Sequence, residues 1–376
     1  MSTFDEIKNE CDNVFLPKDH AGFSEGNQNN LLCVVPNLDL NGAQVVLDEL
    51  LDTIKTEIKD YNVFIMSPED GQYRDYYTNK GYTVCIKQYV RAGALFRIAL
   101  QQYFSAVILN TALVHYYALY FINTNVSVFW WIHESEDSVR TQCPDMPNPY
   151  MLSENIKIYG VTSKVKEAFS NIFRFEIPTL HMAIADKKDE YPRVNGNDKT
   201  IFVLPAAYTY LKGQDILLDA ILSLPAGFRD KAEFLFCGYQ VDGQEEYYNE
   251  ILRISEKIDC VKHLGKLSKD QMYKLYADSD CVIAPSRIDS TPTTIVEAMM
   301  FEKLTIASDK CGISKFITDC VNGFVFSTVD ELVKRLLLVI SDKDALGKIA
   351  KAGREIWSRE FSAEYVADIL RNSGCF

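Results

Sequence analysis

Short, unbroken apolar runs recur along this chain, and segments with a helical pattern separate them. Ten such runs show no sustained alternation of apolar and polar residues: 31–36, 62–67, 82–86, 104–110, 126–133, 157–162, 200–205, 233–238, 280–286 and 304–308. Helical periodicity marks the residues between several of them, at 42–58, 212–224 and 269–279. Strands that are buried on both faces and joined by helices are typical of parallel sheets covered by helices. The pattern therefore predicts an α/β fold built from doubly wound parallel sheets.

The length and one charged segment predict two domains. The 376 residues exceed the size at which a single core usually stops growing. Near the midpoint, residues 185–199 are charged and contain Pro192 and Gly196, a composition typical of an interdomain linker. The doubly wound pattern occurs on both sides of this segment. Two such domains facing a cleft would hold a ligand at the carboxyl ends of their strands.

Charge and cysteine usage exclude several classes of function. A net charge of −13 argues against nucleic-acid binding and against a broadly basic membrane-docking face. The ten cysteines are scattered from Cys11 to Cys375 without a CxxC pair, and several lie inside apolar runs, which favours a reducing cytoplasm. The acidic N-terminus lacks the apolar segment of a signal peptide, and polar residues such as Asn110 and His115 interrupt the apolar stretch 103–122. We expect a soluble, cytoplasmic protein.

The most informative stretch for chemistry reads RIDSTPTTIVEAMM, residues 287–300. It follows a predicted strand and enters a helix whose first amides carry the positive end of the helix dipole, which makes an anion site. Glu297 lies inside the helix and could accept hydrogen bonds from the two hydroxyls of a ribose. Asp289 lies before the loop and could accept hydrogen bonds from hydroxyls of a group attached on the far side of that phosphate. In isolation, such a pair would more often be a turn cap and a solvated helix residue.

Residues 261–326 resemble the C-terminal signature of retaining, family-4-like GT-B glycosyltransferases, a family found among bacterial-type surface-glycan enzymes. The shared features are a strand, Pro-Ser, an acid-x7-Glu spacing, Ala-Met, and later a Gly and an Asn-Gly-Phe turn. The resemblance extends to LKGQDILLDAI at 211–221, NGAQVVLDEL at 41–50 and FWWIHESE at 129–136. It implies the GT-B fold of two Rossmann-like domains. The implied domains are an acceptor-binding domain, 1–188, and a nucleotide-sugar-binding domain, 189–355, with a helix at about 356–376 packing back on the first.

The resemblance also implies a role for each matching residue. Lys212 would neutralise the leaving diphosphate, and His133, otherwise a common kind of structural histidine, would reach the transferred sugar. The implied catalytic residues are His133, Lys212 and Asp289. The implied donor-binding residues are Asn41, Gly42, Lys212, Gly238, Leu264, Asp289, Pro292, Thr293, Thr294 and Glu297. The acceptor is expected on the N-terminal domain, near Glu134–Asp137 and the loop 68–75, with Glu134 and Arg74 as contacts.

Three departures from the family pattern lie within these motifs. Asp289 stands where many relatives have Glu, and Pro292 stands where many have Gly and removes one amide donor. Residues 205–211 contain no Arg to accompany Lys212. These departures leave the donor open and raise the question of which group provides a second cation.

No metal site is predicted. The two acids Asp278 and Asp280 precede a strand, so they are interpreted as turn and cap residues, and the five histidines are dispersed. No GxSxG motif is present, which argues against a serine hydrolase.

The resemblance therefore implies a metal-independent glycosyltransferase of the hexosyltransferase type, acting in polysaccharide biosynthesis without a cofactor. It would move a sugar with retention from a nucleotide diphosphate sugar, UDP-linked in the first instance, to a glycan, a lipid-linked glycan or a protein. A nucleotide-sugar epimerase on the same fold and a catalytically silent GT-B partner subunit remain alternatives. Association with the inner face of the membrane or with a partner transferase, the oligomeric state and the role of residues 1–30 stay open.

Overall fold

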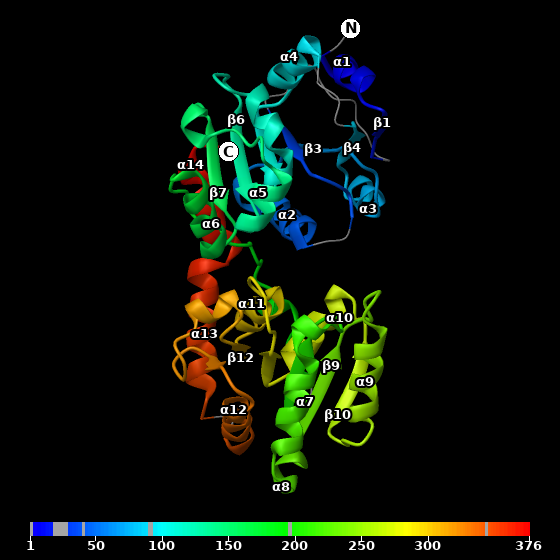
Figure 1. The fold of residues 1–376 in the computed structure, drawn as a ribbon, viewed down its shortest axis with the longest axis vertical. Helices are drawn as coiled ribbons and strands as arrows, with labels where there is room; N and C mark the ends of the chain where they lie inside the picture. The colour runs from blue at the N-terminus through cyan, green and yellow to red at the C-terminus, as the bar shows by residue number, and fades with distance from the viewer. Residues whose placement is uncertain (1–2, 18–28, 40–41, 89–92, 195–197, 343–344) are drawn as a thin grey trace. The chain divides into compact units, whose positions relative to one another are not determined.

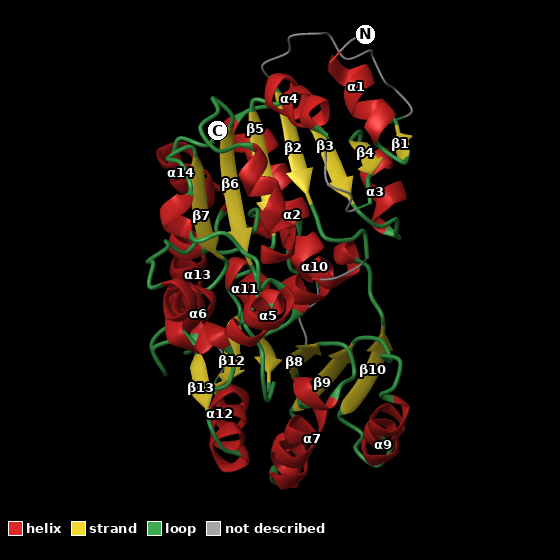
Figure 2. Ribbon diagram, turned by 45° about the horizontal axis from the view of Figure 1, so that its top comes forward, coloured by secondary structure: helices red, strands yellow, loops and turns green. Residues whose placement is uncertain are grey.

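A computed structural model gives the fold of residues 3–17, 29–39, 42–88, 93–194, 198–342 and 345–376 (Figure 1). The chain forms two compact units. The first unit comprises residues 1–183 and 363–376, and the second comprises 184–362. Each unit contains one sheet flanked by helices (Figure 2).

The sheet of the first unit has the strand order β1-β4-β3-β2-β5-β6-β7. Among the described residues, β1 pairs antiparallel with β4, and the other strand pairings are parallel. The strands are β1 (Asn13–Phe15), β2 (Asn30–Val34), β3 (Asn62–Ser67), β4 (Thr83–Ile86), β5 (Ala106–Asn110), β6 (Ser127–Ile132) and β7 (Ile156–Gly160). The α-helices are α1 (Thr3–Glu10), α2 (Gly42–Thr53), α3 (Tyr73–Asn79), α4 (Ala94–Tyr103), α5 (Glu136–Gln142), α6 (Ser163–Phe173) and α14 (Ala363–Ser373), and the other helical segments are η1 (Ile54–Ile58), η2 (Ala112–Tyr120) and η3 (Pro149–Met151).

The sheet of the second unit is wholly parallel in its recorded pairings, with the order β10-β9-β8-β11-β12-β13. Its strands are β8 (Thr200–Pro205), β9 (Ala232–Cys237), β10 (Val261–Gly265), β11 (Cys281–Ala284), β12 (Leu304–Ser308) and β13 (Phe324–Phe326). Its helices are α7 (Gln214–Ser223), α8 (Ala226–Arg229), α9 (Glu245–Ser255), α10 (Lys269–Asp278), α11 (Thr293–Met300), α12 (Val329–Ser341) and α13 (Gly347–Glu360), with turns η4 (Lys188–Glu190), η5 (Tyr210–Lys212) and η6 (Gly312–Phe316).

The central strands form the core of each unit. Every residue of β2 and β8 is buried, which agrees with their unbroken apolar sequences. In the first unit, the rings of Trp130 and Trp131 on β6 are fully buried. In the second, Phe202 and Phe234 stack with their ring centroids 4.8 Å apart. The ten predicted strands and the doubly wound α/β class are therefore confirmed.

Both sheets reverse their strand order at one point. In the first unit the reversal lies between β2 and β5, and in the second between β8 and β11. Ligands of doubly wound sheets bind beyond the carboxyl ends of the strands at such a switch point. The loops that follow β8 and β11 are therefore the place to look for a ligand site in the second unit.

The predicted linker is part of the second unit. Asp186 pairs with Arg354, and Lys188 pairs with Glu302. Arg193 then pairs with Asp280, 3.0 Å away. The charged side chains of this segment, which suggested a linker, therefore form ion pairs with other residues of the second unit. Residues 195–197 lie outside the described part of the chain.

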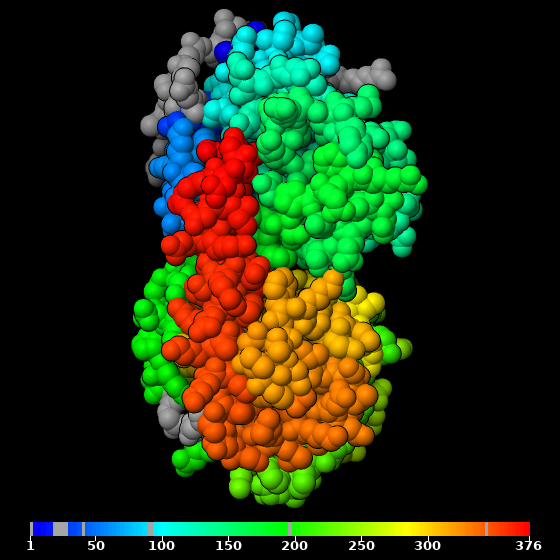
Figure 3. Space-filling model, turned by 90° about the vertical axis from the view of Figure 1, so that its left-hand side faces the viewer, coloured from blue at the N-terminus to red at the C-terminus, as the bar shows by residue number. Residues whose placement is uncertain are grey.

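The chain passes between the units at 183/184 and at 362/363, whereas the predicted boundaries were 188/189 and 355/356. At the two crossings, the amide of Ile184 donates to the carbonyl of Phe361 over 2.7 Å. Helix α13, with the buried Trp357, stays in the second unit. Helix α14 belongs to the first, where it packs on α2 and η1 (Figure 3).

In the described residues, no helix has both the length and the apolar character needed to cross a membrane.

Candidate active site

The loop after β8 presents Lys212 at the switch point of the second sheet. The turn η5 ends at Lys212, and Gly213 follows with a φ of +71°. A Cβ at Gly213 would lie 2.2 Å from the carbonyl oxygen of Pro285, so only glycine allows this loop to approach the loop after β11 so closely. The sequence motif Lys-Gly thus has a local structural reason.

Lys212 and Asp289 meet across these two loops. The Nζ of Lys212 lies 2.5 Å from the Oδ2 of Asp289, whose side chain is only 10% exposed. The carbonyl of Asp289 accepts a hydrogen bond from the amide of Gly312 over 2.9 Å, which fixes the main chain behind the carboxylate. The two residues that the sequence assigned to one site are therefore in contact.

Glu297 lies in the middle of α11, and its side chain is only 5% exposed. Its carboxylate forms an ion pair with Lys269, the first residue of α10, whose own side chain is half exposed. Ser268 and Gln271 form a capping box that begins α10 at this position. The alternative of a solvated glutamate is wrong, because a carboxylate this buried needs a partner.

The start of α11 leaves two amides directed beyond the helix. Pro292 is the N-cap residue, and its carbonyl accepts hydrogen bonds from the amides of Ile295 and Val296. The amides of Thr293 and Thr294 belong to the first turn, which has no intrahelical acceptors. This end of the helix can therefore bind an anion, with one donor fewer than a glycine at position 292 would offer.

Arg287 joins the two loops as well, and sequence reasoning missed it. Its guanidinium donates to both oxygens of Asp215, over 2.9 and 2.6 Å, and lies 3.8 Å from the ring centroid of Tyr210. Burial alone would raise the pKa of Asp215, but hydrogen bonds from Arg287 and Tyr247 lower that pKa below its ordinary value. The pair is therefore ionised at neutral pH.

Gly238 has a packing role at the end of β9. A Cβ there would lie 2.0 Å from the carbonyl oxygen of Ala206, and the amide of Gly238 donates to the carbonyl of Gly265 over 2.9 Å. That amide is therefore already used within the sheet, and a contact to the base through it is not supported. Leu264 is 39% exposed, and its contact with a base stays a prediction.

His133 and Glu134 follow β6 at the carboxyl edge of the first sheet. The Nε2 of His133 is buried and has no hydrogen-bond partner among the described residues. Burial lowers the pKa of His133 to about 3, so the ring is neutral.

The carboxylate of Glu134 accepts hydrogen bonds through one oxygen from the amides of Ala112 and His133, over 2.8 and 3.0 Å. Burial raises the pKa of Glu134. Glu134 therefore organises this edge of the sheet, and its predicted contact with an acceptor stays a prediction.

The remaining predicted residues of the first unit are Asn41, Gly42 and Arg74. Gly42 begins α2, and a Cβ there would meet no atom within 4 Å, so packing in the described structure does not demand glycine. Asn41 lies outside the described residues. Arg74 pairs with Asp70 and Asp75, over 2.5 and 2.9 Å, and is therefore already neutralised.

The two acids that mimic a metal motif are structural. Asp278 accepts from the amide of Val194 over 2.8 Å, and Asp280 accepts from the amide of Ile201 over 2.9 Å. Within the described ranges, no group of three or more His, Cys, Asp or Glu side chains is arranged to hold a metal ion.

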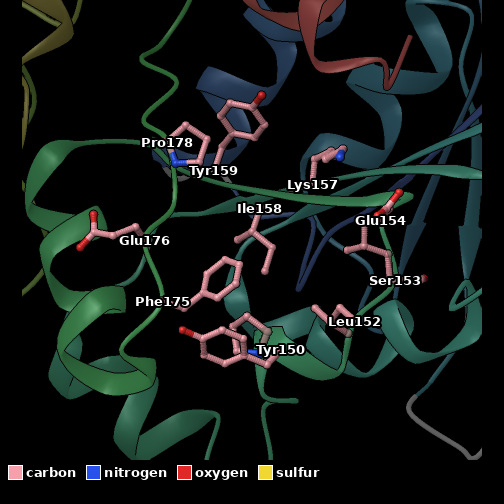
Figure 4. A pocket seen from close by; sticks show the side chains of 12 residues that line it. Tyr150, Leu152, Ser153, Glu154, Lys157, Ile158, Tyr159, Phe175, Glu176 and Pro178 are labelled. Atoms are coloured by element: carbon pink, nitrogen blue, oxygen red, sulfur yellow. The ribbon is translucent and has the colours of Figure 1, made fainter.

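A cavity of about 440 Å³ lies in the first unit (Figure 4). It borders β7, which is the last strand of its sheet. Tyr150 and Phe175 face each other at this cavity with their ring centroids 5.0 Å apart. None of the predicted site residues lines it.

Residues 186–356 match the model of the family "Glycosyl transferases group 1". The matched residues cover most of the second unit. A curated relative of this chain is the lipopolysaccharide 1,2-N-acetylglucosaminetransferase of Salmonella typhimurium, 31% identical over 180 residues. That match covers 45% of this chain and 46% of the relative, so the chain spans about half the length of the curated relative it matches.

Solved structures extend the likeness to both units. Anabaena Alr3699/HepE, solved in complex with UDP and glucose, superposes with a TM-score of 0.72 at 16% identity, covering 92% of this chain and 98% of that one. The lipopolysaccharide outer core galactosyltransferase WaaB superposes with a TM-score of 0.67 at 15% identity, covering 92% and 98%. At such identities the likeness establishes the fold, which is GT-B.

Within the second unit, the fold brings together the residues of two adjacent loops and the helix after them: Lys212, Asp289, Thr293, Thr294 and Glu297. The loop-to-helix pattern indicated Asp289 and Glu297, and the family resemblance indicated Lys212, Thr293 and Thr294. Lys269 and Arg287 could not be found in this way, because their partners lie 28 and 72 residues away. The only sequence signal for Arg287 was its position two residues before Asp289.

Proposed function

We propose that this chain is a retaining glycosyltransferase that moves a hexose from a UDP-linked sugar to a glycan acceptor. The observation that carries the proposal is the contact between Lys212 and Asp289 at the switch point of a group 1 domain. A cation, an acid and the start of α11 lie there on adjacent loops, as a sugar diphosphate requires.

Lys212 is proposed to bind the diphosphate. An ammonium group acts most strongly where charge develops, which in sugar transfer is the departing diphosphate. Because Lys212 is now paired with Asp289, the incoming phosphates would replace the carboxylate as its partner. Asp289 would then be released to accept hydrogen bonds from hydroxyls of the transferred sugar. Charge neutralisation by Lys212 and by the amides of Thr293 and Thr294 is proposed to make a bound metal unnecessary.

Glu297 is proposed to accept hydrogen bonds from the ribose hydroxyls. A carboxylate accepts two such bonds, and charge makes each one stronger than a bond between neutral groups. Lys269 keeps the buried carboxylate neutralised before the nucleotide arrives. UDP is favoured as the nucleotide because the similar structure of Alr3699/HepE was solved with UDP and with UDP-glucose.

The first unit is proposed to bind the acceptor. His133, neutral because of its low pKa, would form a hydrogen bond with a sugar hydroxyl through its unpartnered Nε2. We assign no general base on the protein and expect an oxygen of the donor phosphate to take the proton of the acceptor. A saccharide of a surface polysaccharide is the favoured acceptor, because two of the similar proteins are named as lipopolysaccharide transferases.

The proposed location is the cytoplasm, at the inner face of the membrane. All ten cysteines of the chain are free thiols, as expected in a reducing compartment. Nucleotide sugars as donors fit the same compartment.

Thermal unfolding with a panel of UDP, GDP, CMP, dTDP and ADP sugars tests the proposal. A ligand at 100 times its Kd stabilises the folded state by about 2.7 kcal/mol, which a melting curve resolves readily. We expect a shift with a UDP-sugar, and a much smaller one for Lys212→Ala at the same concentration. If no nucleotide sugar raises the melting temperature of the wild type, the proposed function is wrong.

A further inference from the structure

Arg287 holds the segment that carries Lys212 from both sides. Its main-chain amide donates to the carbonyl of Leu211 over 2.8 Å, and its Nη1 donates to the carbonyl of Tyr210 over 2.8 Å. Its two terminal nitrogens also bind the two oxygens of Asp215, over 2.9 and 2.6 Å. Tyr210 and Leu211 lie immediately before Lys212 in the sequence, and Asp215 lies three residues after it. One side chain on the β11 loop thus fixes the whole turn after β8.

The contacts need the shape of arginine and not only its charge. The planar guanidinium engages both oxygens of Asp215 at once while it lies 3.8 Å from the ring centroid of Tyr210. A lysine has the same charge but neither a flat face nor paired donors. Tyr247 adds a hydrogen bond from its hydroxyl to Asp215 over 2.7 Å, which fixes the carboxylate that Arg287 grips.

We propose that Arg287 is a positioning residue for Lys212, and that it compensates for the arginine missing before Lys212 by holding the lysine in place instead of contacting the diphosphate. This inference rests on the proposed function, because it takes Lys212 as the group that binds the diphosphate. The charge of Arg287 is already balanced by Asp215, so little of it is left for a ligand. The fixed turn keeps the Nζ of Lys212 beside Asp289, where the phosphates would replace the carboxylate.

The test compares the kcat of UDP release for Lys212→Ala, Arg287→Lys and the double variant. Misplacing a catalytic group by about 1 Å can lower a rate by about a hundred-fold, so we expect Arg287→Lys to lower kcat by about 10- to 100-fold. Because Arg287 acts through Lys212, the double variant should be no slower than Lys212→Ala alone. Asp215→Asn removes the other half of the pair and should lower kcat in the same way, also without effect once Lys212 is absent.

Arg335→Lys is the matched control. Arg335 lies on α12, pairs with Asp319, and has a side chain 24% exposed, against 26% for Arg287. It contacts none of the proposed site residues among its recorded partners, so this variant should keep the wild-type kcat. Melting temperatures of all variants separate a lower kcat from a loss of folded protein.

Three outcomes would overturn the inference. If Arg287→Lys and Asp215→Asn keep the wild-type kcat while Lys212→Ala is slow, Arg287 does not position Lys212 and the proposed function stands. If the two losses multiply in the double variant, Arg287 acts on the substrate independently of Lys212. If Lys212→Ala itself keeps the wild-type kcat, the assignment of Lys212 in the proposed function fails, and this inference fails with it.

Discussion

Replacing Glu297 by glutamine tests the proposed ribose site in the second unit. Gln has the same size, but one acceptor oxygen becomes a donor and the negative charge is lost. The side chain is 5% exposed, so water cannot replace the lost interaction. A hydrogen bond to a charged group contributes about 1.5–3 kcal/mol, so UDP binding should weaken by roughly ten- to a hundred-fold. Isothermal titration with UDP measures this loss.

Asp289→Asn should behave differently in the same titrations. Its proposed partners are hydroxyls of the transferred sugar, so the variant should bind a UDP-sugar more weakly than the wild type does. Bare UDP should bind no more weakly, because Lys212 loses its internal partner and stays available for the phosphates.

Glu302→Gln is the control for both titrations. Glu302 pairs with Lys188, as Glu297 pairs with Lys269, but its side chain is 32% exposed and it lies beyond the end of α11. The Glu302→Gln variant should therefore bind UDP as tightly as the wild type does. If Glu297→Gln and Asp289→Asn lose equal affinity for bare UDP, or if neither loses any, the assignment of ribose to one acid and sugar to the other is refuted.

Three further variants test the site and its surroundings. Lys212→Ala should lower kcat by about 10²–10³-fold in protein that is still folded, and near-normal turnover would show that another cation binds the diphosphate. In the unfolded chain His133 takes up a proton near pH 6.5, whereas the folded ring does so only near its pKa of about 3. Between these two values the unfolded state binds more protons than the folded state, so the free energy of unfolding falls as the pH drops below 6.5. His133→Gln should therefore make the unfolding free energy less dependent on pH between about pH 7 and pH 5, and an unchanged slope in urea titrations would contradict the burial of a neutral ring. Gly213→Ala should lower the unfolding free energy by about 1–3 kcal/mol and should also lower kcat, because its Cβ would meet the carbonyl of Pro285. Gly347→Ala is the control, since a Cβ there has open space around it, and it should lower neither quantity. Equal melting temperatures for the two variants would argue against the close loop contact.

The strands were predictable where both faces are buried. Residues 200–205 form an apolar run and are buried throughout as β8. Strand β10 was not among the predicted strands, because it lies at the edge of its sheet, and its polar Lys262 and His263 are not fully buried. The short strands β1 and β13, of three residues each, carry too little sequence pattern to be recognised.

The site was predictable where its residues are close in sequence. Asp289 and Glu297 lie on one loop and the helix that follows it, so the loop-to-helix pattern placed them together. Their ion-pair partners, Lys212 and Lys269, lie on other loops and helices of the second unit. Packing brings them into contact, so no local sequence pattern indicates these pairs. The same holds for the charged segment 185–199, since its charges find partners such as Arg354, 168 residues beyond Asp186.

The most direct measurement of the central claim follows a UDP-sugar by NMR in the presence of oligosaccharide acceptors. We expect that free UDP appears in step with a new glycosidic bond, that the anomeric configuration of the donor is kept in the product, and that Lys212→Ala slows both changes together. A UDP-sugar that returns with an altered sugar and no free UDP, or a product of inverted configuration, would contradict it.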